Sequence, residues 1–255
     1  MHVPSQTEAR LDALREQVRH IENARRPDGR GVLPFGIDAV DDRLAGGGLA
    51  LAALHEAAPE RPSLNDDGAA LLFLAALAGR QSRVKGQGQV LWALARRDLF
   101  APGLAGAGLG PDRLIYAECR DDAEVLAVME EGLRHGGLAA VVGEVSRAAM
   151  ASARRLQLAA EEGGTTALLL RRWRKSGEDP LAAPSSAVTR WRIGCAPSAP
   201  AAHGAGLGRG RWRVALERQR GGPAHDWILE TPDAEARLAL PARSGDRPDQ
   251  AQRAA

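Results

Sequence analysis

One stretch of the chain combines residue types that could meet a phosphate group. Residues 57–70 read AAPERPSLNDDGAA and lie between a short apolar run and a strongly apolar segment that begins near Ala69. A strand, a loop and a helix in this order form the setting in which nucleotide-binding proteins place a phosphate loop. The residues at this phosphate-loop position are Glu60, Arg61, Asp66, Asp67 and Gly68.

The composition of this loop argues against phosphate binding. A phosphate loop has the pattern G-x-x-x-x-G-K-[ST], in which backbone amides and the lysine hold the phosphates and the hydroxyl group holds magnesium. Here Gly68 is followed by two alanines, and Arg61 is the single cation against three carboxylates. Carboxylates repel a triphosphate, and Pro59 and Pro62 each remove an amide donor. We therefore predict that no nucleotide binds here.

A second group of candidate residues combines arginine with tryptophan in segments 171–175, 189–193 and 211–214. Arginines beside aromatic rings can bind single-stranded nucleic acid through phosphate contacts and stacking. Strict alternation in the two later segments also allows another interpretation, in which Trp191 and Trp212 face the core and the arginines form a solvated sheet face. The candidate contacts to nucleic acid or to a partner protein are Arg171, Arg172, Arg174, Arg190, Arg192, Arg211 and Arg213.

Other reactive residue types form no recognisable site in the sequence. The six histidines lie in unrelated segments, and neither G-x-S-x-G nor H-E-x-x-H occurs. Cys119 and Cys195 stand alone, which argues against a zinc or disulfide site and fits a reducing cytoplasm. The N-terminal residues lack a basic start followed by an apolar block, so we expect no signal peptide. We predict no metal, no cofactor, no catalytic residue and no membrane contact.

Periodicity predicts the elements that would position these residues. Near-continuous apolar runs predict strands at 49–56, 89–95, 113–119, 138–144 and 165–171. Helical spacing predicts helices at 37–44, 69–80, 121–135 and 147–162. Buried strands that alternate with helices are typical of a parallel sheet covered on both faces. After residue 171 the pattern changes to alternating strands around Trp191, Trp212 and Trp227, separated by loops rich in proline, alanine and glycine.

The N-terminal residues predict a separate amphipathic helix. Ser5 with Glu8 three residues later is a capping box. The apolar stripe that follows at three- and four-residue spacing consists of Leu11, Leu14, Val18 and Ile21. This stripe would contact a partner protein or dock on its own domain. We expect residues 1–28 to form this helix and a linker, residues 29–238 the core, and residues 239–255 a disordered tail.

The segment LPFGIDAVDDRLAGGGLALAALHEA, residues 33–57, resembles the opening of the RecA core. That opening has a short helix, a GGG turn, a first strand and then the phosphate loop. The order of elements over roughly residues 31–230, with paired W-R-(I/V) strands near Trp191 and Trp212, is similar to the ImuA family. This resemblance implies an α/β, RecA-like fold with a mostly parallel central sheet, covering helices and antiparallel strands toward the C-terminus.

The chain departs from the RecA pattern at the residues that carry the chemistry. RecA-type hydrolysis needs a glutamate base at the end of the strand that precedes Asp98, and Ala95, Arg96 and Arg97 stand there instead. Glu144, which ends AAVVGE, alone matches a Walker-B-like position. The resemblance therefore implies a RecA-like protein whose nucleotide site is vestigial.

The resemblance to the ImuA family also implies a function and partners. The chain would be a non-catalytic scaffold in the SOS response to DNA damage, supporting error-prone translesion synthesis. Its partners would be an ImuB-like protein, an error-prone C-family DNA polymerase and RecA itself, with a weak contact to single-stranded DNA. Two alternatives stay open: a divergent ATPase that binds nucleotide through Glu144 and residues 60–68, and a cell-division inhibitor of the SulA type.

Overall fold

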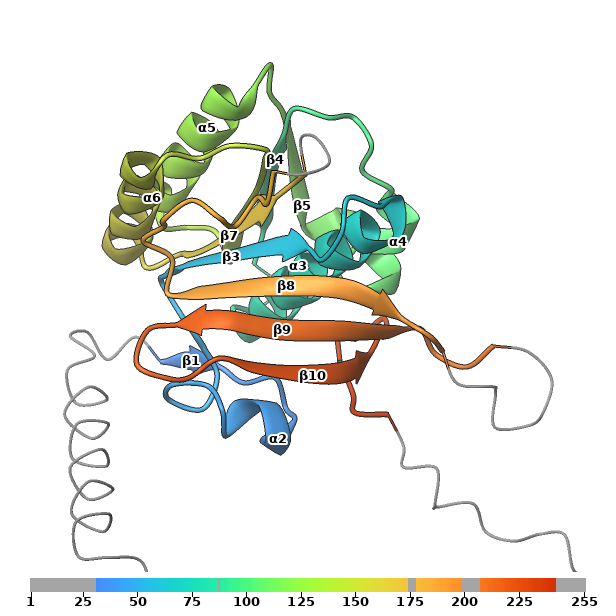
Figure 1. Cartoon of the computed structure of the whole chain (residues 1–255). Coiled ribbons are helices and arrows are strands. Elements are labelled where there is room, and N and C mark those ends of the chain that lie inside the picture. Colours follow the sequence, from blue (N-terminus) through green and yellow to red (C-terminus); the bar gives the residue numbers. More distant parts are fainter. Residues whose placement is uncertain (1–30, 87, 174–177, 199–206, 242–255) are drawn as a thin grey trace, which may run out of the picture.

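The computed structural model describes residues 31–86, 88–173, 178–198 and 207–241. The predicted N-terminal helix, with Leu11, Leu14, Val18 and Ile21, lies outside these residues, as does Arg174. Within them, an eight-stranded sheet runs through the molecule and helices cover it (Figure 1). None of the described helices has the length and apolar character needed to cross a bilayer.

The central sheet is mostly parallel, as predicted. Its strand order is β10-β9-β8-β3-β7-β6-β4-β5. The parallel strands are β3 (Leu54–Pro59), β4 (Val90–Leu94), β5 (Leu114–Glu118), β6 (Ala140–Val145), β7 (Thr166–Arg171) and β8 (Thr189–Ala196). Two antiparallel strands extend the sheet beyond β8, namely β9 (Arg211–Gln219) and β10 (His225–Glu230). A separate two-stranded sheet pairs β1 (Val32–Leu33) with β2 (Leu49–Ala50).

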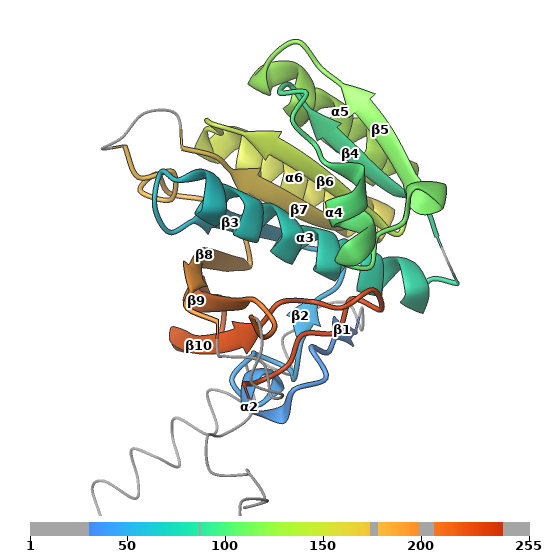
Figure 2. The ribbon, with the colours of Figure 1, turned by 90° about the vertical axis from the view of Figure 1, so that its right-hand side faces the viewer.

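Helices lie on both faces of the sheet (Figure 2). One face carries α3 (Leu64–Val84) and α4 (Ala101–Gly106). The other face carries α5 (Asp122–His135) and α6 (Met150–Gly163). Two short elements complete the described chain, α2 (Asp38–Asp41) and the 3-10 turn η1 (Pro111–Arg113).

Each face of the sheet has its own apolar core, because successive side chains of a strand point to opposite faces. On the α3 face, the rings of Phe35, Phe73, Trp191 and Trp227 pack together with centroid separations of 5.6–6.3 Å. Trp212 is also buried in this core, so the prediction that Trp191 and Trp212 are core residues is confirmed. The opposite core includes Leu54, Met129 and Leu169 between the sheet and α5 and α6.

Two predicted boundaries were wrong. The expected strand 49–56 is broken, because Ala52 adopts a positive φ of 50° between β2 and β3. The expected helix 69–80 begins earlier, at Leu64, because the Ser63 hydroxyl group caps it by accepting a hydrogen bond from the Asp66 N–H. Asp66, Asp67 and Gly68 therefore lie in the first turns of α3 and not in a loop. The short helix α4 was not predicted.

Candidate functional site at the carboxyl ends of the parallel strands

The phosphate-loop position is a short connection between β3 and α3. β3 ends at Pro59, and Ser63 already caps α3, so only a few residues lie between the two elements. The Asp66 carboxylate is buried and accepts hydrogen bonds from the backbone N–H of Cys195 at 2.8 Å and from Arg61 Nε at 3.0 Å. These contacts fasten the first turn of α3 to β8. The helix N-terminus, which would favour a phosphate group, is occupied by the chain's own carboxylates.

A guanidinium group fills the space beside this turn. Arg172, which follows β7, donates to Glu144 of β6 at 2.6 Å and to Asp67 of α3 at 3.3 Å. Its two terminal nitrogens also contact the Asp98 carboxylate, which follows β4, at 3.2 and 3.3 Å. We call these four residues (Asp67, Asp98, Glu144 and Arg172) the Arg172 network. Because β3, β4, β6 and β7 are parallel, the network gathers side chains from four neighbouring strand ends.

Burial sets the electrostatics of the Arg172 network. The Arg172 and Glu144 side chains are only 6% and 2% exposed, whereas the Asp98 side chain is 39% exposed. Loss of hydration raises the pKa of Glu144 and of Asp67, although Arg172 opposes this shift in both. Burial acts to lower the pKa of Arg172, but the carboxylates of Glu144, Asp98 and Asp67 outweigh it and the pKa is raised. The Arg172 guanidinium group therefore stays charged among three carboxylates, and Arg96 also pairs with Asp98 at 3.0 Å.

Two tryptophan side chains make further hydrogen bonds in this region. The Trp92 indole N–H donates to the second oxygen of Glu144 at 2.6 Å. The Trp173 indole N–H donates to the carbonyl oxygen of Pro59 at 3.0 Å, which holds the residue after Arg172 against the end of β3. Both Glu144 oxygens are thus engaged within the protein. A Walker-B-type carboxylate must instead be free to act on a metal-bound nucleotide, so the geometry opposes the divergent ATPase alternative.

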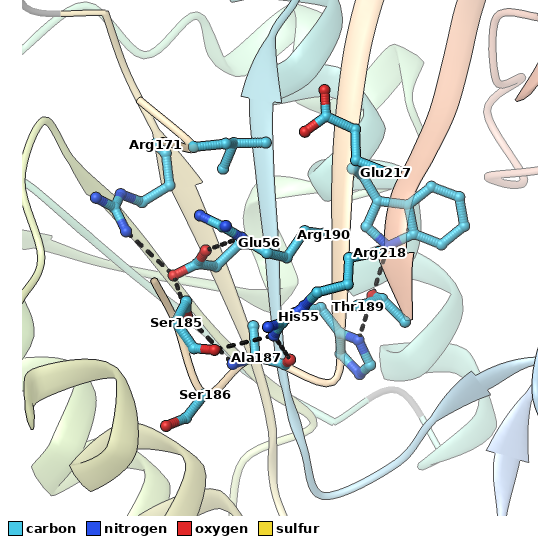
Figure 3. A network of polar contacts seen from close by, with 12 residues as sticks. His55, Glu56, Arg171, Ser185, Ser186, Ala187, Thr189, Arg190, Glu217 and Arg218 are labelled. Carbon is cyan, nitrogen blue, oxygen red and sulfur yellow. Dashed lines mark hydrogen bonds and ion pairs between the residues drawn. The ribbon is translucent and has the colours of Figure 1, made fainter. Parts of the chain in front are cut away.

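A second polar network lies on the opposite face of the sheet (Figure 3). Glu56 of β3 is fully buried and accepts from Arg171 of β7 at 3.1 Å, from Arg190 of β8 at 2.9 Å and from the Ser185 hydroxyl at 2.8 Å. We call these four residues the Glu56 network. It places one carboxylate between two guanidinium groups, so cations are in excess here, whereas carboxylates are in excess in the Arg172 network. It joins β3 to its two neighbours in the sheet, β7 and β8.

A buried histidine lies next to Glu56 in the sequence but on the other side of β3. His55 Nε2 is 2.7 Å from the Ala50 carbonyl oxygen, which can only accept, so Nε2 carries the proton. His55 Nδ1 then accepts from the Thr189 hydroxyl at 2.7 Å, and the Thr189 oxygen accepts from the Trp191 indole. Desolvation lowers the pKa of His55 from 6.5 to about 4. His55 is therefore a neutral structural residue at physiological pH.

The structure places three of the seven candidate contact arginines in the interior. Arg171, Arg172 and Arg190 are buried and paired with Glu56 or Glu144, so the expectation that Arg190 belongs to a solvated sheet face was wrong. A buried guanidinium group that is already paired is not available to a phosphate group.

The other described candidates lie nearer the surface. Arg192 pairs with Asp179 and Glu217, and Arg213 pairs with Glu60 across the end of the sheet. Arg211 is partly exposed at the start of β9. The acidic residue Glu60 of the phosphate-loop position therefore serves here to neutralise an arginine of β9.

Several residues of these networks were not recognised from the sequence as partners of one another. Neither Asp98 nor Glu56 was predicted to pair with a buried arginine. A usable signal was the spacing of the polar residues, since Glu56, Glu144 and Arg171 each interrupt or end an otherwise apolar strand. A charged residue in a doubly covered parallel strand needs a charged partner, but the pattern does not tell which strand supplies it.

Comparison with known proteins places this site in a family. The chain is 41% identical over 207 residues to Protein ImuA from Caulobacter vibrioides strains NA1000/CB15N and ATCC 19089/CIP 103742/CB 15. The match covers 80% of this chain and 84% of each relative. The chain belongs to the ImuA family.

A solved structure supports the fold of this ImuA-family protein. The crystal structure of the RadB recombinase superposes with a TM-score of 0.56 over 82% of this chain and 99% of that chain. The two sequences are 16% identical, so the likeness shows the RecA-like fold alone. No protein-family model matches the chain. The resemblance to the ImuA family and the RecA-like fold expected from the sequence are both confirmed.

Proposed function

We propose that this ImuA-family protein is a RecA-like scaffold without ATP chemistry. It acts in the cytoplasm during the SOS response and helps an ImuB-like protein and an error-prone C-family DNA polymerase to carry out translesion synthesis, with RecA as a further partner. The partners follow from the family membership. The absence of ATP chemistry rests on the geometry of the site.

The observation that carries the proposal is the position of Arg172. A Mg–nucleotide complex on a RecA-like fold needs a cation held between the first turn of the phosphate-loop helix and the carboxylate that ends a neighbouring strand. In this chain the Arg172 guanidinium group bridges Asp67, in the first turn of α3, and Glu144, at the Walker-B-like position. The internal cation removes both the charge and the space that a metal-bound nucleotide requires.

The same contacts explain how a scaffold would keep its shape without a ligand. Arg172 and Trp173 tie the segment after β7 to β3, β6 and α3. In a nucleotide-dependent protein, ligand binding would have to supply such connections. Here they are part of the folded chain, so the surface built on these elements is expected to be the same with or without nucleotide.

A reconstitution experiment tests the proposal. The full chain, the ImuB-like protein and the C-family polymerase are purified from one bacterium and mixed without nucleotide, with Mg–ATP, and with a hydrolysis-resistant ATP analogue. We expect a complex of the same stoichiometry and affinity in all three conditions. Assembly that requires ATP would overturn the ligand-independent scaffold, and failure to assemble in every condition would overturn the partner assignment.

A direct contact with single-stranded DNA remains a separate proposal. Among the described candidates, Arg211 and Arg213 remain accessible, because Arg171, Arg172 and Arg190 are buried and Arg192 is held by Asp179 and Glu217. Arg213 is already paired with Glu60, so we expect such a contact to be weak and strongly salt-dependent.

A further inference from the structure

Strand β5 forms an unprotected edge of the central sheet. It pairs with β4 on one side, and no described residue pairs with its other side. Ile115 and Tyr116 are exposed by 44% and 41%, and the strand sequence LIYAE contains no proline or bulge to discourage pairing. Its single charge, Glu118, is paired with Arg97 at 2.7 Å. The opposite edge differs, because the end of β10 is bridged by Ala239.

The backbone of β5 offers a defined set of free hydrogen-bonding groups. The N–H of Cys119, directly after β5, donates to the Leu94 carbonyl oxygen at 2.9 Å and so points toward β4. Backbone groups of a strand alternate between its two sides. The N–H and C=O groups of Leu114, Tyr116 and Glu118 therefore point to the open edge.

We infer that β5 pairs with β5 of a second copy of this chain, antiparallel and centred on Tyr116. In this register Leu114 lies opposite Glu118 of the second copy, Tyr116 lies opposite Tyr116, and each pair exchanges both backbone hydrogen bonds. Every N–H and C=O group that these three residues point to the open edge then has a partner within β5 of the second copy. Centring the pair on Ile115 or Ala117 leaves Glu118 or Leu114 opposite a residue outside the strand.

The side chains favour the same arrangement. Tyr116 meets its own copy at the twofold axis, and cross-strand aromatic pairs are stabilising. Asp112 and Arg120 flank the strand at equal distances from Tyr116, and their side chains are 76% and 86% exposed, although each also pairs within its own chain, with Arg113 and Glu124. Antiparallel pairing puts Asp112 of each copy near Arg120 of the other, whereas parallel pairing would oppose like charges. Two eight-stranded sheets would join into one continuous sheet.

Charge substitutions at neighbouring positions test the pairing. Sedimentation of the full chain over a range of concentrations is expected to show a reversible monomer–dimer equilibrium, weak because a single strand pair buries little surface. Tyr116→Lys should abolish the dimer, since it places two lysines opposite each other on the axis. Ile115→Lys is the matched control: its exposure is similar, but it lies opposite Ala117 and should retain the dimer.

Cross-linking fixes the register independently. In a background with Cys119→Ser and Cys195→Ser, Tyr116→Cys should form an intermolecular disulfide on mild oxidation, because paired Cα atoms lie about 5.5 Å apart. Leu114→Cys should not, because its copy lies several residues away along the strand. A protein that stays monomeric at all concentrations, or cross-linking at position 114 in preference to 116, would overturn the inference. If the protein is monomeric, the β5 edge would instead be available to a strand of another protein.

Discussion

The two buried networks sit on opposite faces of the same sheet and have opposite charge ratios. The Arg172 network holds one guanidinium group among three carboxylates at the strand ends, where Asp98 still reaches solvent. The Glu56 network holds one fully buried carboxylate between two guanidinium groups within the strands. The first occupies the place of a ligand, and the second joins β3 to β7 and β8.

The difference between the networks shows what the loss of a ligand site requires. A charge within the sheet has no access to water, so its partners must be complete and permanent. At the strand ends Asp98 still reaches solvent, and desolvation raises the pKa values of Glu144 and Asp67, so protonation can relieve an unpaired charge there. At the strand ends, an internal arginine can therefore replace an external cation at a small cost in stability. In the Glu56 network, removal of any one charge is expected to destabilise the fold strongly. Two substitutions probe this contrast, and a third tests the buried histidine next to Glu56.

The largest effect is expected from Glu56→Gln. Removing the carboxylate leaves the buried Arg171 and Arg190 facing each other without a counter-charge, which typically costs about 3–5 kcal/mol. Urea unfolding at neutral pH measures the change. The matched control is Glu217→Gln, which breaks an Arg192 pair whose carboxylate side chain is 39% exposed and should cost less than about 1 kcal/mol. Equal losses in the two variants would contradict the contrast.

A smaller effect is expected on acidification, through His55. Its folded pKa of about 4 lies below the ordinary value of 6.5, so the unfolded chain binds the proton more readily. The stabilisation is complete above pH 6.5 and is lost as the pH falls toward about 4, by roughly 3 kcal/mol in total. Glu144 and Asp67 act in the opposite sense, because their raised pKa values make protonation favour the folded state.

The measurement is the free energy of unfolding at closely spaced pH values between neutrality and about 4. His55→Gln should flatten the curve over this range, whereas His135→Gln, at an exposed position on α5, should leave its slope unchanged. If the His55 variant and the unsubstituted protein show the same slope, the buried histidine does not control stability in acid.

The smallest effect of the three is expected from Arg172→Met. The apolar side chain keeps much of the volume but removes the guanidinium group that pairs with Asp67 and Glu144, whereas Asp98 keeps its contact with Arg96. We expect a cost of roughly 2 kcal/mol, because the carboxylates can take up protons. The loss should shrink as the pH is lowered, since protonation removes the repulsion. Arg172→Lys, which keeps the charge, should lose less. A loss that grows on acidification would contradict the assigned charge balance.

Much of the fold followed from local patterns. Apolar runs alternating with helical spacing predicted the parallel sheet, and strict alternation placed Trp191 and Trp212 in the core. The early start of α3 was missed because the acidic residues after Ser63 were interpreted as an unfavourable phosphate loop. The same carboxylates suit the first turn of a helix, and Ser63 followed by Asp66 is a capping pattern.

The candidate site was only half predictable. The missing lysine and the carboxylates at the phosphate-loop position indicated the loss of nucleotide binding without any structure. The replacement could not be predicted, because Arg172 meets Asp67, Asp98 and Glu144 only after four strands take their places in the sheet. Arg190 was wrongly expected on a solvated face for a related reason. Alternation tells which residues lie on the same face of the sheet, but it does not tell that residues near Ser185, together with Glu56 of β3, bury that face.

Titration calorimetry of the full-length protein with Mg–ATP tests the central claim most directly, namely that Arg172 occupies the place of a metal-bound nucleotide. We predict no saturable heat for the native chain at any accessible concentration, and no nucleotide-dependent rise in melting temperature. Saturable binding of Mg–ATP by the native chain, weakened by Glu144→Gln, would show that the site is open and would contradict the account.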